Sequence, residues 1–310
     1  MQYALTNRGI AVICGGTSSE REISMSSGAA IADALKKAGW KVEILDWAEK
    51  EIVYRCKELL EFDVVFIGYH GGAGEDGHVQ AALELCDIPY TGSGPLASAL
   101  AMDKIYSKRV FEQAGIPTAR WFPWEGNTPP NAEQVRKSVG FDFPIVIKPA
   151  AEGSTVGVTI AKNTDELATG IEKARECGPR MLFEEYIPGR EVTTAILEDV
   201  RLPVVEIIPE GGFYDYEHKY TKGASKYVAP AELAEEIADR LIDTGTKAFN
   251  LLGLKHYARL DFRLDGDNFY CLEANSLPGM TALSLVPMAA RAVGIEFPEL
   301  VDRIVRMAIK

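Results

Sequence analysis

The sequence predicts a protein of mixed class, with an α/β parallel-sheet region followed by a region of α+β character. In its first hundred residues, short β-branched runs alternate with helical patterns. The runs lie at 10–14, 42–45 and 64–67, and the clearest helical pattern covers 26–38. This alternation is typical of a parallel sheet flanked by helices.

Changes in this pattern divide the chain into three predicted domains. The turn-forming segment IPYTGSGP at 88–95 interrupts the alternation, so the N-terminal domain is placed at 1–96. A helix, an apolar strand and a glycine-containing loop then form a small central domain at 97–187. The C-terminal domain, at 188–310, has predicted strands near 192–197, 204–208, 257–264 and 269–274 and a long helix near 231–250. We expect an antiparallel sheet there.

Composition and charge favour small-molecule chemistry. The net charge of -12 opposes binding to nucleic acids or anionic membranes, and no basic patch offsets it. The five cysteines are scattered and lack CxxC spacing, which fits reduced thiols without a disulfide or zinc role. No apolar run approaches the ~20 residues that cross a bilayer, and no signal peptide is visible. We therefore expect a cytoplasmic protein.

The predicted C-terminal hairpin carries the most informative polar pattern. Side chains alternate along a strand, so Arg259 and Asp261 share one face, as do Glu273 and Asn275 on the returning strand. If these two faces coincide, two carboxylates and an amide oxygen converge beside an arginine. Such oxygens suit Mg²⁺, and the arginine could neutralise charge on an acyl or phosphoryl oxygen. A solvated face with an ordinary ion pair explains the same pattern.

Other segments offer weaker signals for anion binding. Lys104 and Lys148 could meet a phosphate as point charges, although lysines at strand ends are usually just solvated. The loop EGSTVG at 152–157 could wrap over phosphate but is not a P-loop. The segment GGTSSE at 15–20 could present backbone donors but lacks GxGxxG. His70 ends an apolar strand where ligands gather, though a lone histidine is more often structural.

Taken in order, these segments resemble the D-alanine–D-alanine ligases of the ATP-grasp superfamily, from Val12 to Val305. The matching stretches are GGTSSERE at 15–22, HGGAGEDG at 70–77, PYTGSG at 89–94, MDK at 102–104, KP at 148–149, EGSTVG at 152–157, FYDYEHKY at 213–220, RLD at 259–261 and EANSLPGMT at 273–281. The resemblance implies an ATP-grasp fold, in which a Rossmann-like N-terminal domain precedes two ATP-grasp subdomains and ATP lies between two antiparallel sheets.

The resemblance also implies the roles of individual residues. The catalytic set is Glu20, Ser154, Tyr220, Arg259 and Gly279, of which the first three form a hydrogen-bonded trio. Substrate contacts fall to Glu20, His70, Ser284 and Leu285. ATP contacts fall to Lys104, Lys148, Glu184, Tyr186, Ile187, Glu191 and Lys219. Asp261, Glu273 and Asn275 are implied to hold two Mg²⁺ ions, with Mn²⁺ as a possible substitute.

The implied activity is ATP-dependent ligation of two D-alanines through an acyl phosphate, which supplies a dipeptide for peptidoglycan precursors. A lid at 216–227 and a homodimer are also implied. Thr155 and Ser276 replace residues common in close relatives, but both keep a hydroxyl. Two alternatives stay open: a D-alanine–D-lactate ligase, against which Tyr220 argues, and a catalytically silent ATP-binding module.

Overall fold

The computed structural model describes residues 8–209 and 225–309. Its N-terminal part contains a three-stranded parallel sheet in the order β2-β1-β3, formed by β1 (Ile10–Gly15), β2 (Val42–Trp47) and β3 (Val64–Ile67). β1 pairs in parallel with both neighbours, and all its residues are buried. The predicted parallel sheet is therefore confirmed.

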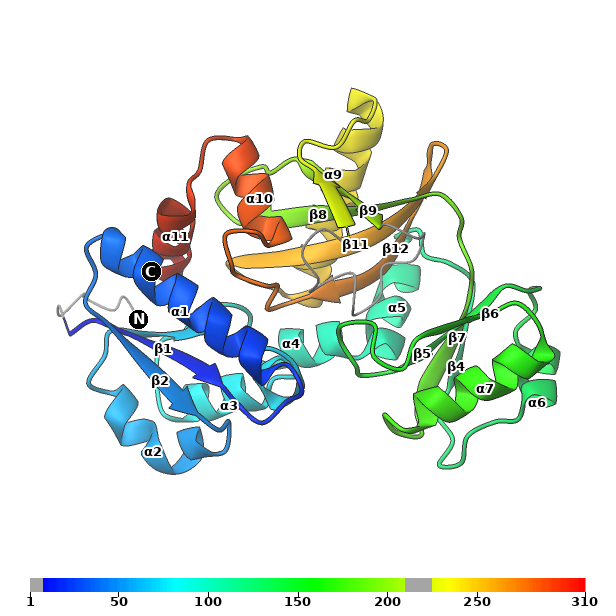
Figure 1. Cartoon of the computed structure of the whole chain (residues 1–310), viewed down its shortest axis with the longest axis horizontal. Helices are drawn as coiled ribbons and strands as arrows, with labels where there is room; N and C mark the ends of the chain where they lie inside the picture. The colour runs from blue at the N-terminus through cyan, green and yellow to red at the C-terminus, as the bar shows by residue number, and fades with distance from the viewer. Residues whose placement is uncertain (1–7, 210–224, 310) are drawn as a thin grey trace.

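Helices flank this sheet (Figure 1). They are α1 (Arg21–Lys37), α2 (Glu51–Leu59) and α3 (His78–Leu85). α1 begins before the predicted position, and the buried positions near its start are occupied by Ser24 and Ser27. Ser24 Oγ donates to the backbone oxygen of Gly68 at 2.8 Å. Buried serines conceal the apolar face on which a periodicity-based prediction depends.

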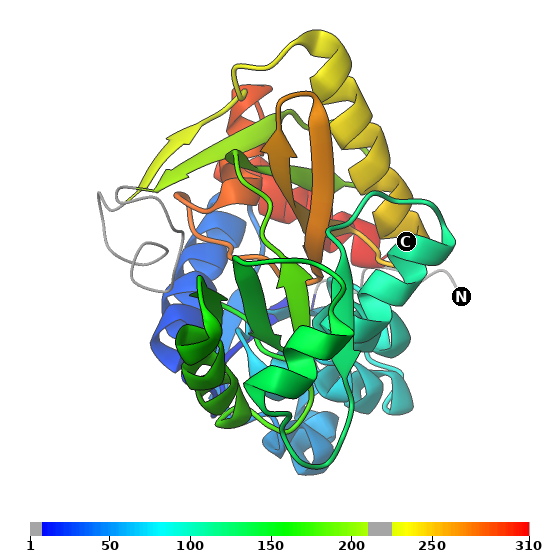
Figure 2. The ribbon, with the colours of Figure 1, turned by 90° about the vertical axis from the view of Figure 1, so that its right-hand side faces the viewer.

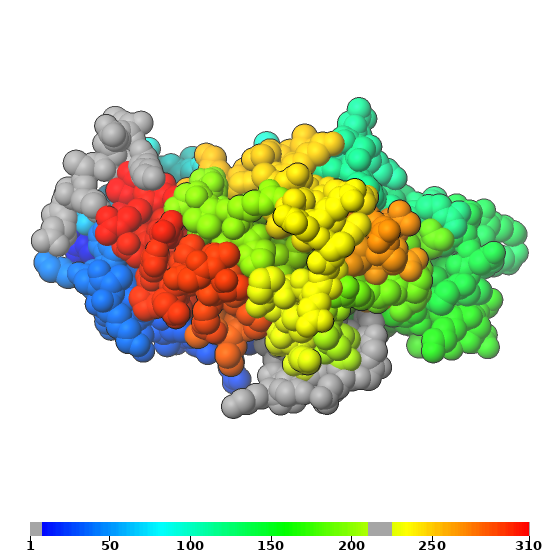
Figure 3. All heavy atoms as spheres, turned by 90° about the horizontal axis from the view of Figure 1, so that it is seen from above, coloured from blue at the N-terminus to red at the C-terminus, as the bar shows by residue number. Residues whose placement is uncertain are grey.

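The C-terminal helix α11 (Phe297–Ile309) returns to this N-terminal part. It packs on α1, and its buried side chains share one core with the strands β1 and β3. Figure 3 shows the C-terminal end of the chain lying against N-terminal residues. The two ends of the described chain thus share one core. The predicted bounds, which place α11 in the C-terminal domain at 188–310, do not show this.

A small antiparallel sheet with the order β4-β7-β5-β6 forms the central part. Its strands are β4 (Trp121–Trp124), β5 (Ile145–Pro149), β6 (Thr159–Ala161) and β7 (Met181–Glu185). Helices α6 (Ala132–Ser138) and α7 (Thr164–Arg175) pack with it around their own core. Two helices, α4 (Pro95–Met102) and α5 (Lys104–Gln113), lead into this part from the N-terminal one.

A five-stranded antiparallel sheet, in the order β10-β9-β8-β11-β12, forms the C-terminal part. Its strands are β8 (Arg190–Leu197), β9 (Val204–Pro209), β10 (Ser225–Val228), β11 (Tyr257–Asp265) and β12 (Asn268–Asn275). Helices α9 (Glu235–Leu252) and α10 (Leu285–Ala292) complete it. Figure 2 shows the strands of this sheet above those of the central sheet. The predicted antiparallel sheet is confirmed.

Candidate active site

The register of β11 and β12 brings the two predicted polar faces of the hairpin together. Arg259 lies opposite Asn275, and Asp261 lies opposite Glu273. The only shift in register comes after these pairs, between Asp261 and Phe262, so it does not disturb them. Residues directly opposite one another project to the same side of a sheet. The hairpin therefore presents one arginine, two carboxylates and one amide on a single face.

Asp261 is the most tightly held member of this face. The guanidinium of Arg259 donates to both of its oxygens, from Nε at 2.8 Å and from Nη2 at 2.8 Å. Thr193 Oγ1 adds a hydrogen bond at 2.7 Å. The paired contact fixes the plane of the guanidinium as well as the carboxylate. Thr193 is a supporting residue that no sequence motif indicated.

Lys104 joins the hairpin to the loop of the central part. Its Nζ lies 3.1 Å from Glu273 Oε2 and donates to the backbone oxygen of Glu152 at 2.5 Å. Asp103 begins α5 just before it and accepts hydrogen bonds from the backbone N–H groups of Ile105 and Tyr106. This cap fixes the first turn of the helix, and with it the base of the Lys104 side chain.

Ser154 and Glu20 meet as predicted, although 134 positions separate them. Ser154 Oγ donates to Glu20 Oε1 at 2.5 Å, which links the central loop to the loop before α1. Ser154 and Thr155 both adopt positive φ angles, of 50° and 63°. Such conformations cost of the order of 1 kcal/mol for residues other than glycine, so packing must hold this loop. Tyr220 and Lys219 lie outside the described residues.

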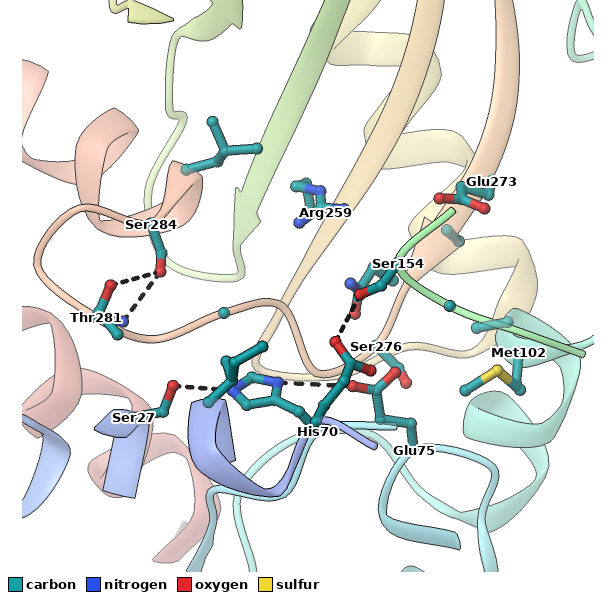
Figure 4. Close-up of a pocket in the computed structure, with 18 of the residues that line it drawn as sticks. Ser27, His70, Glu75, Met102, Ser154, Arg259, Glu273, Ser276, Thr281 and Ser284 are labelled. Atoms are coloured by element: carbon teal, nitrogen blue, oxygen red, sulfur yellow. Dashed lines mark hydrogen bonds and ion pairs between the residues drawn. The ribbon is translucent and has the colours of Figure 1, made fainter. Parts of the chain in front are cut away.

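His70 lies at the base of the same region, between two polar partners (Figure 4). Its Nε2 is 2.9 Å from Ser27 Oγ, and its Nδ1 is 3.7 Å from Glu75 Oε1. Glu75 also accepts a hydrogen bond from the backbone N–H of Gly71 at 3.0 Å. The ring is thus oriented from both sides. Ser27 and Glu75 were missed as site residues, although Glu75 lies in the matching stretch at 70–77.

The segment before α10 has a compact turn of its own. Thr281 donates from its backbone N–H to Ser284 Oγ at 3.1 Å, and the two hydroxyl oxygens are 2.9 Å apart. A side chain at Gly279 would approach Ser284 Oγ to about 3.0 Å. The absence of a side chain there leaves the backbone accessible. Leu285 is the first residue of α10, so the helix N-terminus faces this turn.

These residues surround a cavity of about 700 Å³, a size typical of small-molecule sites. It draws on all three predicted domains, and ten of the predicted site residues line it: Glu20, His70, Lys104, Ser154, Arg259, Glu273, Asn275, Gly279, Ser284 and Leu285. Figure 4 shows Arg259 and Glu273 on one side of the cavity and His70 with Ser27 on the other. The cavity can therefore place an anion beside cations while it holds a second polar molecule.

Of the predicted ATP residues that the structure describes, Lys104 lines this cavity, whereas Lys148, Glu184, Tyr186, Ile187 and Glu191 do not. Arg263 gathers three of them: its Nε donates to the backbone oxygen of Ile187 at 3.1 Å, its Nη1 is 3.4 Å from Glu191 Oε2, and its guanidinium stands 5.9 Å from the ring of Tyr186. Arg263 was missed at the sequence level. It could have been found from strand alternation, because it follows Arg259 and Asp261 on the same face of β11.

Glu184 lies beneath the surface, with 1% of it exposed. Its carboxylate forms ion pairs with two lysines, Lys108 and Lys148. Burial would raise the pKa of Glu184, but the two positive charges outweigh it and hold that pKa below the ordinary value. Burial likewise opposes the charge of Lys148, yet Glu184 and Glu273 together raise its pKa. Lys108 was not predicted to belong to the site.

Two family models match the chain. The model described as D-ala D-ala ligase N-terminus matches residues 45–93, and the one described as D-ala D-ala ligase C-terminus matches residues 110–306. A D-alanine–D-alanine ligase of Syntrophotalea carbinolica is 44% identical over 305 residues, which cover 97% of this chain and 96% of that protein. One of Carboxydothermus hydrogenoformans is 42% identical over 308 residues, covering 97% and 98%.

Solved structures resemble the chain over the same extent. A D-alanine–D-alanine ligase from Bacillus anthracis complexed with ATP has a TM-score of 0.83 at 33% identity and covers 96% of each chain. The VanG D-Ala:D-Ser ligase from Enterococcus faecalis has a TM-score of 0.81 at 28% identity, covering 96% of this chain and 98% of that one. The likeness therefore spans all three parts of the fold.

Proposed function

The chain belongs to the D-alanine–D-alanine ligase family, and we propose that it joins two D-alanine molecules to D-alanyl-D-alanine while ATP becomes ADP and phosphate. The observation that carries the proposal is the cavity where the hairpin face of β11 and β12 meets the Ser154–Glu20 contact. A catalytically silent module would have no need to keep Arg259, Glu273 and Asn275 around one cavity.

The hairpin face has the chemistry of a magnesium site. Asp261, Glu273 and Asn275 offer hard oxygen atoms from adjacent strands, and Arg259 and Lys104 already supply positive charge to both carboxylates. These three residues would hold the ions. Bound Mg²⁺, or Mn²⁺ in its place, would neutralise charge on the phosphates of ATP. Among residues 8–209 and 225–309, no three His, Cys, Asp or Glu side chains gather as a metal site.

In the first step we propose, a carboxylate oxygen of one D-alanine attacks the γ-phosphorus of ATP, giving an acyl phosphate and ADP. Glu20 would bind the ammonium group of this D-alanine. The carboxylate of Glu20 is held in place by the hydrogen bond from Ser154. Lys104 and Lys148 would receive the phosphates. Lys219 is assigned the same role, and Tyr220 joins Ser154 and Glu20; both lie outside the described residues.

In the second step, the amine of another D-alanine attacks the acyl carbon and phosphate leaves. Its carboxylate would lie at the turn of Ser284 and Leu285, where the N-terminus of α10 favours negative charge. Arg259 and the backbone N–H of Gly279 would stabilise the oxyanion of the tetrahedral intermediate. A donor of this kind is typically worth ~3 kcal/mol of the barrier. His70 would orient a substrate from the opposite wall.

The adenine and ribose are assigned to Glu184, Tyr186, Ile187 and Glu191. Arg263 supports this assignment because it holds the last three of these residues together.

Cytoplasmic location and a homodimer are part of the proposal. In the ranges 8–209 and 225–309, no helix is long and apolar enough to cross a membrane. Light scattering of the purified protein tests the dimer: the proposal expects twice the chain mass of 33.9 kDa.

The experiment that tests the function is ADP release in the presence of ATP and Mg²⁺, with mass spectrometry of the product. D-Alanine, L-alanine, D-alanine with D-lactate, and D-alanine with D-serine are compared. We expect ADP release and a product with the mass of D-alanyl-D-alanine in the three reactions that contain D-alanine, and neither with L-alanine alone. A depsipeptide or a D-serine product would redirect the specificity. Nucleotide binding without ADP release would support the silent module.

A further inference from the structure

Lys108 is a buried charged side chain to which no role has yet been given. It lies on α5 one turn after Lys104, so the two side chains project from the same face of the helix. Its side chain has no exposed surface. Lysines are almost never fully buried unless they are paired, because removing the ammonium from water is costly. Its position therefore depends on partners that compensate the charge.

The partners of Lys108 belong to both antiparallel sheets. Its Nζ contacts the carboxylate of Glu184 on β7 and the hydroxyl of Thr118. Thr118 Oγ1 then donates to the backbone oxygen of Cys271 on β12 at 2.7 Å. β7 lies in the four-stranded sheet and β12 in the five-stranded one. Lys108 thus joins the two sheets between which ATP is proposed to bind.

The contact continues from Glu184 to a proposed phosphate ligand. Glu184 Oε1 faces Lys108, while Oε2 faces Lys148 Nζ. Lys148 ends the buried run of β5, and its side chain is only 12% exposed. The position of Lys148 is therefore set by Glu184, and that of Glu184 by Lys108.

The charges of this buried cluster, Lys108, Lys148 and Glu184, do not cancel. Two lysines face one glutamate, so the sum is positive when both lysines are protonated. Burial lowers the pKa of Lys108, and Glu184 acts against that effect. Without Lys108, Glu184 and Lys148 would form a balanced pair, and the attraction for a polyanion would fall.

We propose that Lys108 is a positioning residue for ATP: it fixes Glu184, and through it Lys148, while Thr118 ties the same ammonium to the β12 backbone. The inference rests on the proposed function because it assumes that ATP binds between the two sheets. It adds a residue that does not itself touch the nucleotide.

The test compares Lys108→Met with the wild type. Isothermal titration calorimetry with Mg²⁺ and a non-hydrolysable ATP analogue measures binding directly. We expect Kd to rise about tenfold, the lower end of the effect that loss of a supporting residue has at metal sites. The KM for ATP should rise with it, while the KM for D-alanine and kcat stay within about twofold. Lys108→Arg keeps the charge and should recover part of the affinity.

The matched control is Arg109→Met, which removes a positive charge from the next position of the same helix. Arg109 pairs with Glu125 at the surface, at 2.5 Å, and is not part of the buried cluster of Lys108, Lys148 and Glu184. Its analogue Kd should stay within about twofold of the wild-type value, as for most surface substitutions.

Thr118→Val and Thr118→Ser keep the test decisive if Lys108→Met fails to fold. The valine removes the hydroxyl that joins Lys108 to Cys271, whereas the serine keeps it. We expect weaker analogue binding for the valine variant only. Unchanged Kd in the folded variants, or a fall in kcat with unchanged KM for ATP, would overturn the inference.

The wild type separates this inference from the ligase proposal. If it binds the analogue but forms no dipeptide, the ligase proposal fails and the variants still decide the role of Lys108. If it binds no analogue at all, both fail.

Discussion

The hairpin face and the buried cluster of Lys108, Lys148 and Glu184 both place charged side chains near the proposed ATP site. They differ in the elements that form them. Arg259 and Asp261 are neighbours on one strand, and a simple turn brings their partners opposite them. The buried cluster combines a helix with two strands of another sheet. On the hairpin face, Arg259 and Glu273 line the cavity, and Glu273 is 27% exposed. In the cluster, Lys108 and Glu184 are almost fully buried and contact each other. We infer that the hairpin face contacts the reacting atoms of the substrates. In the buried cluster, Lys108 and Glu184 hold a neighbouring side chain in position.

The sharpest way to separate the two regions is Glu184→Gln. It leaves two buried lysines without a carboxylate, and breaking a buried pair in this way typically costs about 3–5 kcal/mol of unfolding free energy. Urea denaturation measures the loss. Glu185→Gln is the matched control, because Glu185 pairs with Arg120 at the surface and should matter far less. Equal effects in both variants would remove the distinction between the regions.

Arg259→Ala should lower activity without preventing folding, whereas Glu184→Gln should mainly lower stability. We expect a normal fold and a fall in kcat of about 10²–10³, because a preorganised donor to the oxyanion is lost. Steady-state dipeptide formation and the urea midpoint measure the two properties on the same preparation. Arg240→Ala is the control in the same part of the chain, since Arg240 is exposed and lies away from the cavity. Normal turnover in Arg259→Ala would remove Arg259 from the mechanism.

Ser154→Ala tests a third kind of contact, which joins two domains at the cavity. The variant loses a hydrogen bond to a carboxylate, worth about 1.5–3 kcal/mol. The KM for the first D-alanine should therefore rise about tenfold or more, with the KM for ATP little changed. Thr155→Ala is the comparison, as Thr155 shares the positive φ of the loop. Similar KM changes in both variants would point to loop geometry instead of Glu20.

The smallest expected effect concerns pH. The pKa of Glu184 is held below its ordinary value of 4.5: burial opposes this, but Lys108 and Lys148 outweigh it. A depressed pKa contributes stability above the unfolded value, and that stability is lost as the pH falls through the folded value. The stability gap between the wild type and Glu184→Gln should therefore narrow below about pH 4.5. A gap that stays constant to lower pH would contradict the assigned charge state.

Local periodicity explains which features could be predicted from the sequence. The parallel sheet, the antiparallel sheet and the common face of the hairpin all follow from alternation along strands. Lys108 could not be found this way, because a lysine in a helix is ordinarily solvated. Its spacing of four from Lys104 places both residues on one face of α5, but that spacing does not show that Lys108 is buried. Ser27 and Thr193 were missed for a similar reason: their roles depend on partners distant in the chain.

The resemblance supplied what periodicity did not. The Ser154–Glu20 contact across 134 positions has no signal in composition or spacing, and it was expected only from the order of matching motifs. The path of the chain between residues 210 and 224 lies outside the described structure, so the roles of Lys219 and Tyr220 stay predictions.

The most direct test of the ligase mechanism follows an oxygen atom. D-Alanine labelled with ¹⁸O in its carboxylate is incubated with the enzyme, ATP and Mg²⁺, and the released phosphate is analysed by mass spectrometry. If the carboxylate attacks the γ-phosphorus and phosphate later leaves the acyl carbon, one labelled oxygen must appear in each phosphate formed with D-alanyl-D-alanine. Unlabelled phosphate alongside the dipeptide would contradict an acyl phosphate and the roles given to Arg259 and Gly279.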